Sequence, residues 1–198
     1  MNSQLWFEPL VWMDYRLAVV LAVIMPIAIL IWAFVEKSES IQHLLAIYWR
    51  VASLLAITIY LMIASSPLSF VSAFLARLLI PISLWFWADI NEDINDQLPS
   101  PLKLTVTSWR WATTIYHILG AIALIPFLPC GFSAGAINTP FCEVWLKAPW
   151  LYKQYFHAGS TPKFLGFLGI TALMIYVLYL AYFVLIRLAK QGRSAIEH

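Results

Sequence analysis

Five long apolar stretches constrain this chain more than any other feature of its sequence. They lie at about 15–35, 41–64, 70–88, 108–128 and 164–186. Each is close to the roughly 20 residues that an α-helix needs to cross the hydrocarbon core of a bilayer. Only 11% of the residues are charged, whereas soluble domains carry about 25%, so there is too little polar surface to cover a soluble fold. The sequence therefore predicts an all-α, polytopic transmembrane helical bundle of about five spans.

The ends of the chain add little to this bundle. We expect one transmembrane domain, residues 1–190, followed by a short polar tail at 191–198. Residues 1–14 contain no Lys or Arg, so they lack the basic start of a cleavable signal peptide. Their Trp, Phe and Leu side chains predict a short segment lying against the headgroups. Pro26, in the middle of the first span, frees the carbonyl of Ala22 and predicts a kink.

A group of acids follows the third apolar stretch, spaced i, i+3, i+4 and i+7, so that a continuing helix places them on one face. We call them the acidic face; they are Asp89, Glu92, Asp93 and Asp96. A third helix that continues to its last acid is about 27 residues and about 40 Å long. It exceeds a hydrocarbon core of about 30 Å, so the acids should project into water. Because these carboxylates repel one another, we expect countercharges from Arg50 and Arg110, which each follow a Trp near the start of the second and fourth helices.

The acidic face has two interpretations. One is a solvated helix end that serves as a docking surface. The other is a metal site, because the stretch at 92–96 resembles the acid-acid-x-x-acid signature by which isoprenoid enzymes hold diphosphate through Mg²⁺. Those enzymes normally carry a second acidic motif, and the other acids of this chain form none. The sequence leaves the metal unknown, and it predicts no cofactor apart from Mg²⁺ under this second interpretation.

Arg77 lies inside the third apolar stretch, about seven residues from its start. An intramembrane arginine costs a few kcal/mol or more and marks a functional site with a partner to be named. No acid lies in the middle of a predicted span, so the expected partners within the chain are neutral side chains and helix carbonyls near the outer face, and the expected ligands are a lipid phosphate or a carboxylate from a partner helix. The neutral candidates are Ser72, Tyr60, Ser65 and Ser66. The alternative is an arginine that snorkels to the interface.

Other classes of site are poorly represented. Only His117 lies well inside a predicted span, and bis-histidine haem needs two histidines at similar depth on neighbouring helices. No nucleophile elbow, glycine-rich phosphate loop or metalloprotease motif is present. A transporter that uses Arg77 for an anion is a third class, disfavoured because no pair of broken helices is visible. The sequence therefore leans against an enzyme without deciding the matter.

The orientation follows from the basic residues after the fifth stretch. These are Arg187, Lys190 and Arg193. The positive-inside rule places this tail in the cytoplasm, and five spans then place the N-terminus outside or in a lumen. Cys130 and Cys142 fall in the longest loop, on the outer side, where oxidation is permitted. A disulfide and a pair of free thiols are the two alternatives for them.

Three stretches carry a resemblance to a known family. They read LVWMDYRL at 10–17, IYWRVASLLAIT at 47–58 and LWFWADINED at 84–93. With them the chain resembles, over about 1–190, an uncharacterised cyanobacterial family of small integral membrane proteins, a domain of unknown function. The resemblance implies a photosynthetic bacterial membrane, either thylakoid or plasma membrane. It implies no activity and no catalytic residues.

We therefore expect a non-enzymatic membrane protein, an accessory or assembly factor of a photosynthetic or respiratory complex. Its expected partners are membrane lipid and that larger complex. A net charge of +2 is too small for a nucleic-acid footprint. The alternative is a small Mg-dependent enzyme acting on a phosphorylated lipid or isoprenoid, with Arg50 and Arg110 on the phosphate. Acids that splay into water favour docking, whereas acids folded against these arginines around a cavity favour the enzyme.

Overall fold

The computed structural model of the chain describes residues 5–133 and 135–195. Within these ranges the regular structure is helical, without a strand. Five helices are long and apolar enough to cross a membrane. This confirms the predicted multi-pass helical bundle.

The five spanning helices alternate in direction, and their bounds are as follows. The first joins α1 (Glu8–Ala18), a π-helical turn (Val19–Ile24) and α2 (Met25–Val35). The second and third are α3 (Glu39–Ile63) and α4 (Leu68–Trp85). The fourth joins α6 (Pro101–Leu124) to the 3-10 helix η2 (Ile125–Gly131). The fifth joins α9 (Pro162–Tyr182) to the π-helical turn η5 (Phe183–Arg187).

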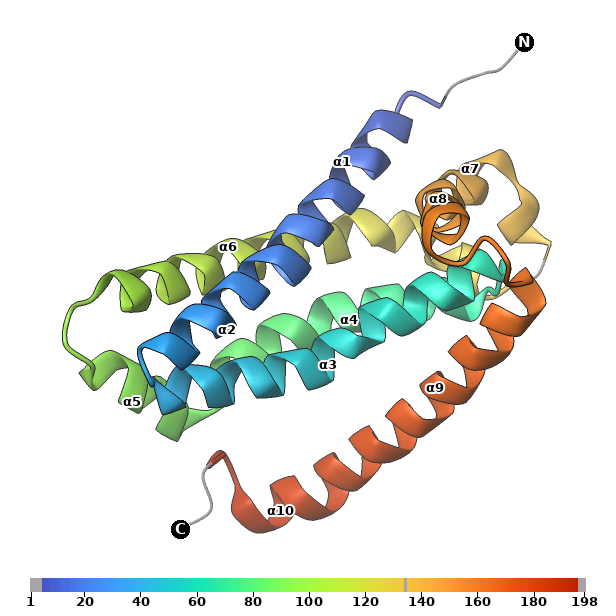
Figure 1. Cartoon of the computed structure of the whole chain (residues 1–198). Helices are drawn as coiled ribbons and strands as arrows, with labels where there is room; N and C mark the ends of the chain where they lie inside the picture. The colour runs from blue at the N-terminus through green and yellow to red at the C-terminus, as the bar shows by residue number, and fades with distance from the viewer. Residues whose placement is uncertain (1–4, 134, 196–198) are drawn as a thin grey trace.

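Shorter helices close the two ends of the bundle (Figure 1). One end, the α5 end, carries α5 (Ala88–Asp96), the turn between α2 and α3, and α10 (Leu188–Gln191). The other, the disulfide end, carries the start of α1 and the segment between α6 and α9. That segment contains η3 (Ala136–Asn138), α7 (Pro140–Glu143), η4 (Val144–Leu146) and α8 (Lys147–Phe156). It is therefore a folded cap rather than an open loop, and in it Cys130 and Cys142 form a disulfide.

The first spanning helix begins at Glu8, earlier than the expected start at residue 15. A separate interfacial segment at 1–14 is therefore wrong for residues 8–14, and residues 1–4 lie outside the described part. Pro9 in the first turn and an acid beside it favour a helix start at this point. The consequence is that Asp14 belongs to a spanning helix.

The proline in this helix is accommodated by side chains of two neighbouring helices. Pro26 follows the π-helical turn and cannot donate to the carbonyl of Ala22. The hydroxyl of Tyr48 donates to that oxygen at 2.8 Å. Nε1 of Trp109 donates to the adjacent carbonyl of Leu21 at 2.8 Å. Because a lipid environment offers no water to such carbonyls, these two bonds tie α3 and α6 to the first helix.

The fifth helix lies at the edge of the bundle (Figure 1) and is mostly exposed, with 11% of its most apolar window buried. It touches α3 at the disulfide end through glycines. A Cβ on Gly166 would lie 2.4 Å from Cβ of Ala64, and one on Gly169 would lie 3.2 Å from Leu61. Small residues of this kind let two helix backbones approach closely in a membrane.

We predict that Gly166→Ala lowers the stability of the protein by about 1–3 kcal/mol, since neither methyl group can move without shifting a backbone. Thermal unfolding in a mild detergent measures this loss. Gly159→Ala is the matched control, because no atom lies within 4 Å of the added methyl group. Equal stability of the two variants would show that the contact does not hold α9.

Candidate functional site

An ion pair joins two spanning helices in the interior of the bundle. Nη2 of Arg77, on α4, lies 2.5 Å from Oδ2 of Asp14, on α1. Arg77 is 7% exposed, so the guanidinium is covered by the protein itself. The intramembrane charge singled out in the sequence thus has an acidic partner within the protein, which sequence reasoning missed by leaving Asp14 outside the first span.

The fourth spanning helix completes this cluster. The Tyr116 hydroxyl lies 3.0 Å from both Oδ1 and the backbone oxygen of Asp14, to which it donates. The guanidinium of Arg77 lies 5.2 Å from the centre of the Tyr116 ring. A Cβ at position 120 would lie 1.8 Å from Nη1 of Arg77, so Gly120 makes room for the guanidinium. The cluster fixes the register of three helices, and its charges compensate each other.

His117 and Thr113 lie on the buried face of the same helix, at 1% and 0% exposure. Neither ring nitrogen of His117, nor the hydroxyl of Thr113, hydrogen-bonds to another of the described residues. Buried polar groups in a bundle are costly when they lack a partner. The predicted intramembrane histidine is therefore a core residue with unused hydrogen-bonding capacity, packed edge-on against the Tyr116 ring at 5.0 Å.

The third spanning helix does not continue to Asp96, as expected; it ends at Trp85. Trp87 is extended, with φ −83° and ψ 111°, and a separate helix α5 begins at Ala88. We call residues 84–88 the elbow. Nothing in the spacing of the acids reveals this break, because all four acids lie after it, within α5.

Side-chain donors occupy the carbonyl oxygens that the break leaves open at the end of α4. Nη2 of Arg110 donates to Leu84 at 2.6 Å, and Nδ2 of Asn91 donates to Trp85 at 3.0 Å. Arg110 also donates to Oδ1 of Asn91, and its guanidinium lies 4.0 Å from the centre of the Trp85 ring. The expected pairing of Arg110 with the acidic face is therefore wrong, because this arginine is buried and committed to the elbow.

The C-terminal tail is docked on the elbow. Nε of Arg193 donates to the carbonyl of Phe86 at 2.8 Å, and the carbonyl of Arg193 accepts from the backbone N–H of Ala88 at 3.1 Å. Oδ2 of Asp89 accepts from the backbone N–H of Ala195 at 2.7 Å. The expected polar tail is thus held in place up to Ala195, where the described part of the chain ends.

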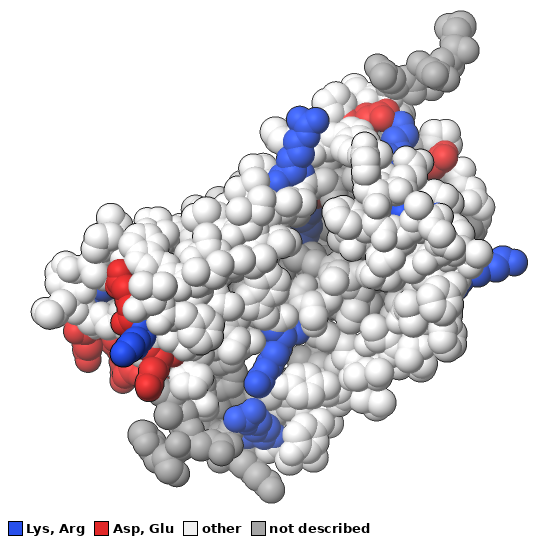
Figure 2. Space-filling view, viewed as in Figure 1, with Lys and Arg blue, Asp and Glu red and all other residues white. Residues whose placement is uncertain are grey.

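The acidic face does not act as one group. Asp89 turns toward the tail, whereas Glu92, Asp93 and Asp96 are exposed. Of these, Asp93 accepts from the Ser40 hydroxyl at 3.3 Å, which ties α5 to the start of α3. Figure 2 shows acidic side chains gathered at the end of the molecule where Figure 1 places α5. The opposite side of α5 is apolar and buried.

The expected ion pair between Arg50 and the acidic face is also wrong for the described residues. This side chain is exposed on α3, and it forms no ion pair with another described residue. Across 5–133 and 135–195, no three His, Cys, Asp or Glu side chains are grouped so that they could hold a metal ion. The acids and the two arginines therefore do not converge on a common cavity. The two Trp-Arg pairs therefore differ in their surroundings: Arg110 supports the elbow, whereas Arg50 is exposed on α3.

Comparison with known proteins gives a family and no function. The model of a family described as "Protein of unknown function (DUF3177)" matches residues 8–196. No curated protein and no solved structure matches the chain. The match covers all five spanning helices, the elbow and the ion pair.

We predict that Arg77→Met destabilises the protein by about 3–5 kcal/mol, because it leaves the half-buried Asp14 inside a spanning helix without its countercharge. Arg16→Met is the control, since Arg16 is exposed on the same helix as Asp14 and its loss should change stability by about 0.5 kcal/mol or less. Thermal unfolding in detergent separates the two. A loss no larger than that of the control contradicts a buried, paired guanidinium.

We predict that Asn91→Ala lowers stability by about 2–3 kcal/mol, because it removes an acceptor from Arg110 and a donor from the Trp85 carbonyl. Asn95→Ala, on the exposed side of the same helix, should stay within about 0.5 kcal/mol of the wild type. Protease digestion should also cut the Asn91→Ala variant faster near the elbow. Indistinguishable digestion of the two variants would remove Asn91 from the elbow's support.

Proposed function

The chain belongs to the DUF3177 family of proteins of unknown function, and we propose that it acts without catalysis, as an accessory or assembly factor of a bioenergetic membrane complex. In this proposal the complex is photosynthetic or respiratory. The membrane is the thylakoid or plasma membrane of a photosynthetic bacterium. The protein contacts its partner both within the bilayer and at the α5 end.

The observation that carries the proposal is the fixed presentation of three exposed acids on α5, at positions 92, 93 and 96. The apolar side of this helix is anchored by Ile90 and Ile94, which are 0% and 1% exposed. Hydrogen bonds from Arg110, Asn91 and Arg193 to carbonyls of the elbow fix the direction of α5 relative to α4. A rigid charged surface suits recognition of a partner with a complementary basic surface, since little ordering is needed on binding.

The apolar flanks suit the intramembrane part of such a contact. Large side chains along α9 are exposed, among them Phe167, Ile175 and Leu178 at 64%, 64% and 71%. These residues face lipid or a partner helix equally well. A helix attached to the bundle along one side leaves most of its surface for an adjoining protein.

The orientation that we propose places the α5 end in the cytoplasm and the disulfide end outside or in a lumen. The basic residues that follow α9 support this by the positive-inside rule. The bonded Cys130 and Cys142 support it independently, because disulfides persist in oxidising compartments. The acidic docking surface would then meet a cytoplasmic part of the partner.

The Mg-dependent enzyme fits the geometry less well. It needs the acids near a phosphate held by Arg50 and Arg110, but the second of these arginines is buried in the elbow. The exposed acids point into water rather than into a lined cavity. A docking surface accounts for these positions without any further movement of the helices.

We predict that the triple change Glu92→Gln, Asp93→Asn and Asp96→Asn reduces the recovery of the partner complex by about fivefold or more at low salt. Tagged protein is purified from its native membrane in a mild detergent, and the co-purified proteins are identified by mass spectrometry. The three acids are exposed, and Asp93→Asn keeps an acceptor for the Ser40 hydroxyl, so the free energy of unfolding should change by about 1 kcal/mol or less.

Glu143→Gln is the control, because it removes an exposed acid at the disulfide end. It should leave recovery of the partner unchanged. The proposal fails if wild-type protein migrates alone and deletion of its gene leaves every membrane complex intact. It also fails in its docking part if the triple variant recovers the partner as well as the wild type does.

A further inference from the structure

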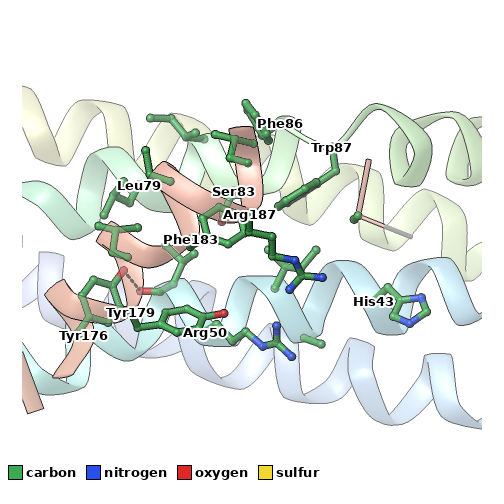
Figure 3. A pocket seen from close by; sticks show the side chains of 18 residues that line it. His43, Arg50, Leu79, Ser83, Phe86, Trp87, Tyr176, Tyr179, Phe183 and Arg187 are labelled. Carbon is green, nitrogen blue, oxygen red and sulfur yellow. Dashed lines mark hydrogen bonds between the residues drawn. The ribbon is translucent and has the colours of Figure 1, made fainter. Parts of the chain in front are cut away.

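A groove of about 400 Å³ lies between α3, α4 and the last part of the fifth spanning helix. Figure 3 shows its walls, which are mainly aliphatic and aromatic. Ile47 contributes from α3, Leu79 and Ile82 from α4, and Leu180 and Phe183 from α9 and η5. The volume is within the usual range of small-molecule sites, about 300–1,000 Å³. We call it the α9 groove.

The charged side chains of this groove are basic. Arg50 enters from α3 and Arg187 from η5, and Figure 3 shows both guanidinium groups directed to the side on which His43 lies. No Asp or Glu is among the described residues that line the groove. The apolar walls thus carry positive charge at one end only.

Arg50 is exposed although it lies far inside a spanning helix. It follows Glu39, the first residue of α3, by 11 residues, which is about 16 Å along the helix axis. Its side chain makes no hydrogen bond or ion pair with the described residues. A guanidinium at this depth, with lipid tails beside it, is costly unless an anion compensates its charge.

We propose that the α9 groove binds one membrane lipid with an anionic headgroup. The headgroup oxygens, of a phosphate or a sulfonate, lie against Arg50 and Arg187. A guanidinium donates two parallel N–H groups to such an anion. One acyl chain lies along the apolar wall formed by α4 and α9. A free anion would leave the apolar wall without a ligand, and an uncharged lipid would leave Arg50 without a countercharge. The combination therefore favours a lipid with an anionic headgroup.

The groove also touches the elbow and the docked tail. Phe86, Trp87 and Ala195 form part of its lining, and the first and last of these residues belong to the docked tail contact. A bound lipid therefore packs against the support of α5. This site differs from the docking surface and does not depend on it.

Native mass spectrometry of the full chain in a mild detergent tests the proposal, with dioleoyl-phosphatidylglycerol as the probe. One molecule should bind per protein, and dioleoyl-phosphatidylcholine, with the same chains and no net charge, should bind about tenfold more weakly or not at all. Arg50→Gln should weaken phosphatidylglycerol binding by about tenfold or more. Ala46→Phe, which fills the groove and keeps both arginines, should weaken it as well.

Arg16→Gln is the matched control, since this exposed arginine lies on α1, outside the groove. It should retain the wild-type affinity. Inorganic phosphate at millimolar concentration should not displace the lipid; full displacement would reduce the site to an anion site and overturn the lipid assignment. The proposal is also overturned if Arg50→Gln binds phosphatidylglycerol as tightly as Arg16→Gln does, or if the two lipids bind equally.

Discussion

The structure depends first on the ion pair between Asp14 and the buried Arg77. Either charge alone inside a bilayer is costly, and the pair is tolerated because each group compensates the other and the Tyr116 hydroxyl adds a further hydrogen bond. The pair can form only when α1, α4 and α6 have one relative register. The elbow is supported by Arg110 of α6 at the end of α4, and the bond from Trp109 joins α6 to the first spanning helix, so both contacts lie on helices whose register this interaction sets.

Backbone polar groups inside the membrane are also paired within the protein. Carbonyls freed inside a membrane must find donors within the protein. Tyr48 and Trp109 donate to those near Pro26, and Arg110 with Asn91 donates to those at the end of α4. Tyr48, Trp109 and Arg110 therefore stabilise the bends in these helices. What stays available for partners is the exposed part of α5, the flanks of α9 and the groove beside Arg50.

The sequence was sufficient to predict the fold class and the five spans, because these depend on the length and apolarity of local stretches. It was not sufficient to predict which side chains meet. Arg50 and Arg110 occupy the same Trp-Arg pattern, yet one faces a groove and the other is buried under α5, since their helices face different neighbours. Asp14 was misplaced because charged residues near the end of an apolar stretch are hard to assign. Pro9 beside Glu8 was the available signal that the helix starts earlier.

A double-mutant cycle across the ion pair tests the organising role of this interaction most directly. The free energy of unfolding in a mild detergent is measured for the wild type, Asp14→Leu, Arg77→Met and the double variant. If the two charges compensate each other, the double variant loses less stability than the sum of the two single losses, by about 2 kcal/mol or more. Losses that add to within about 0.5 kcal/mol would contradict a direct pair and the helix register derived from it.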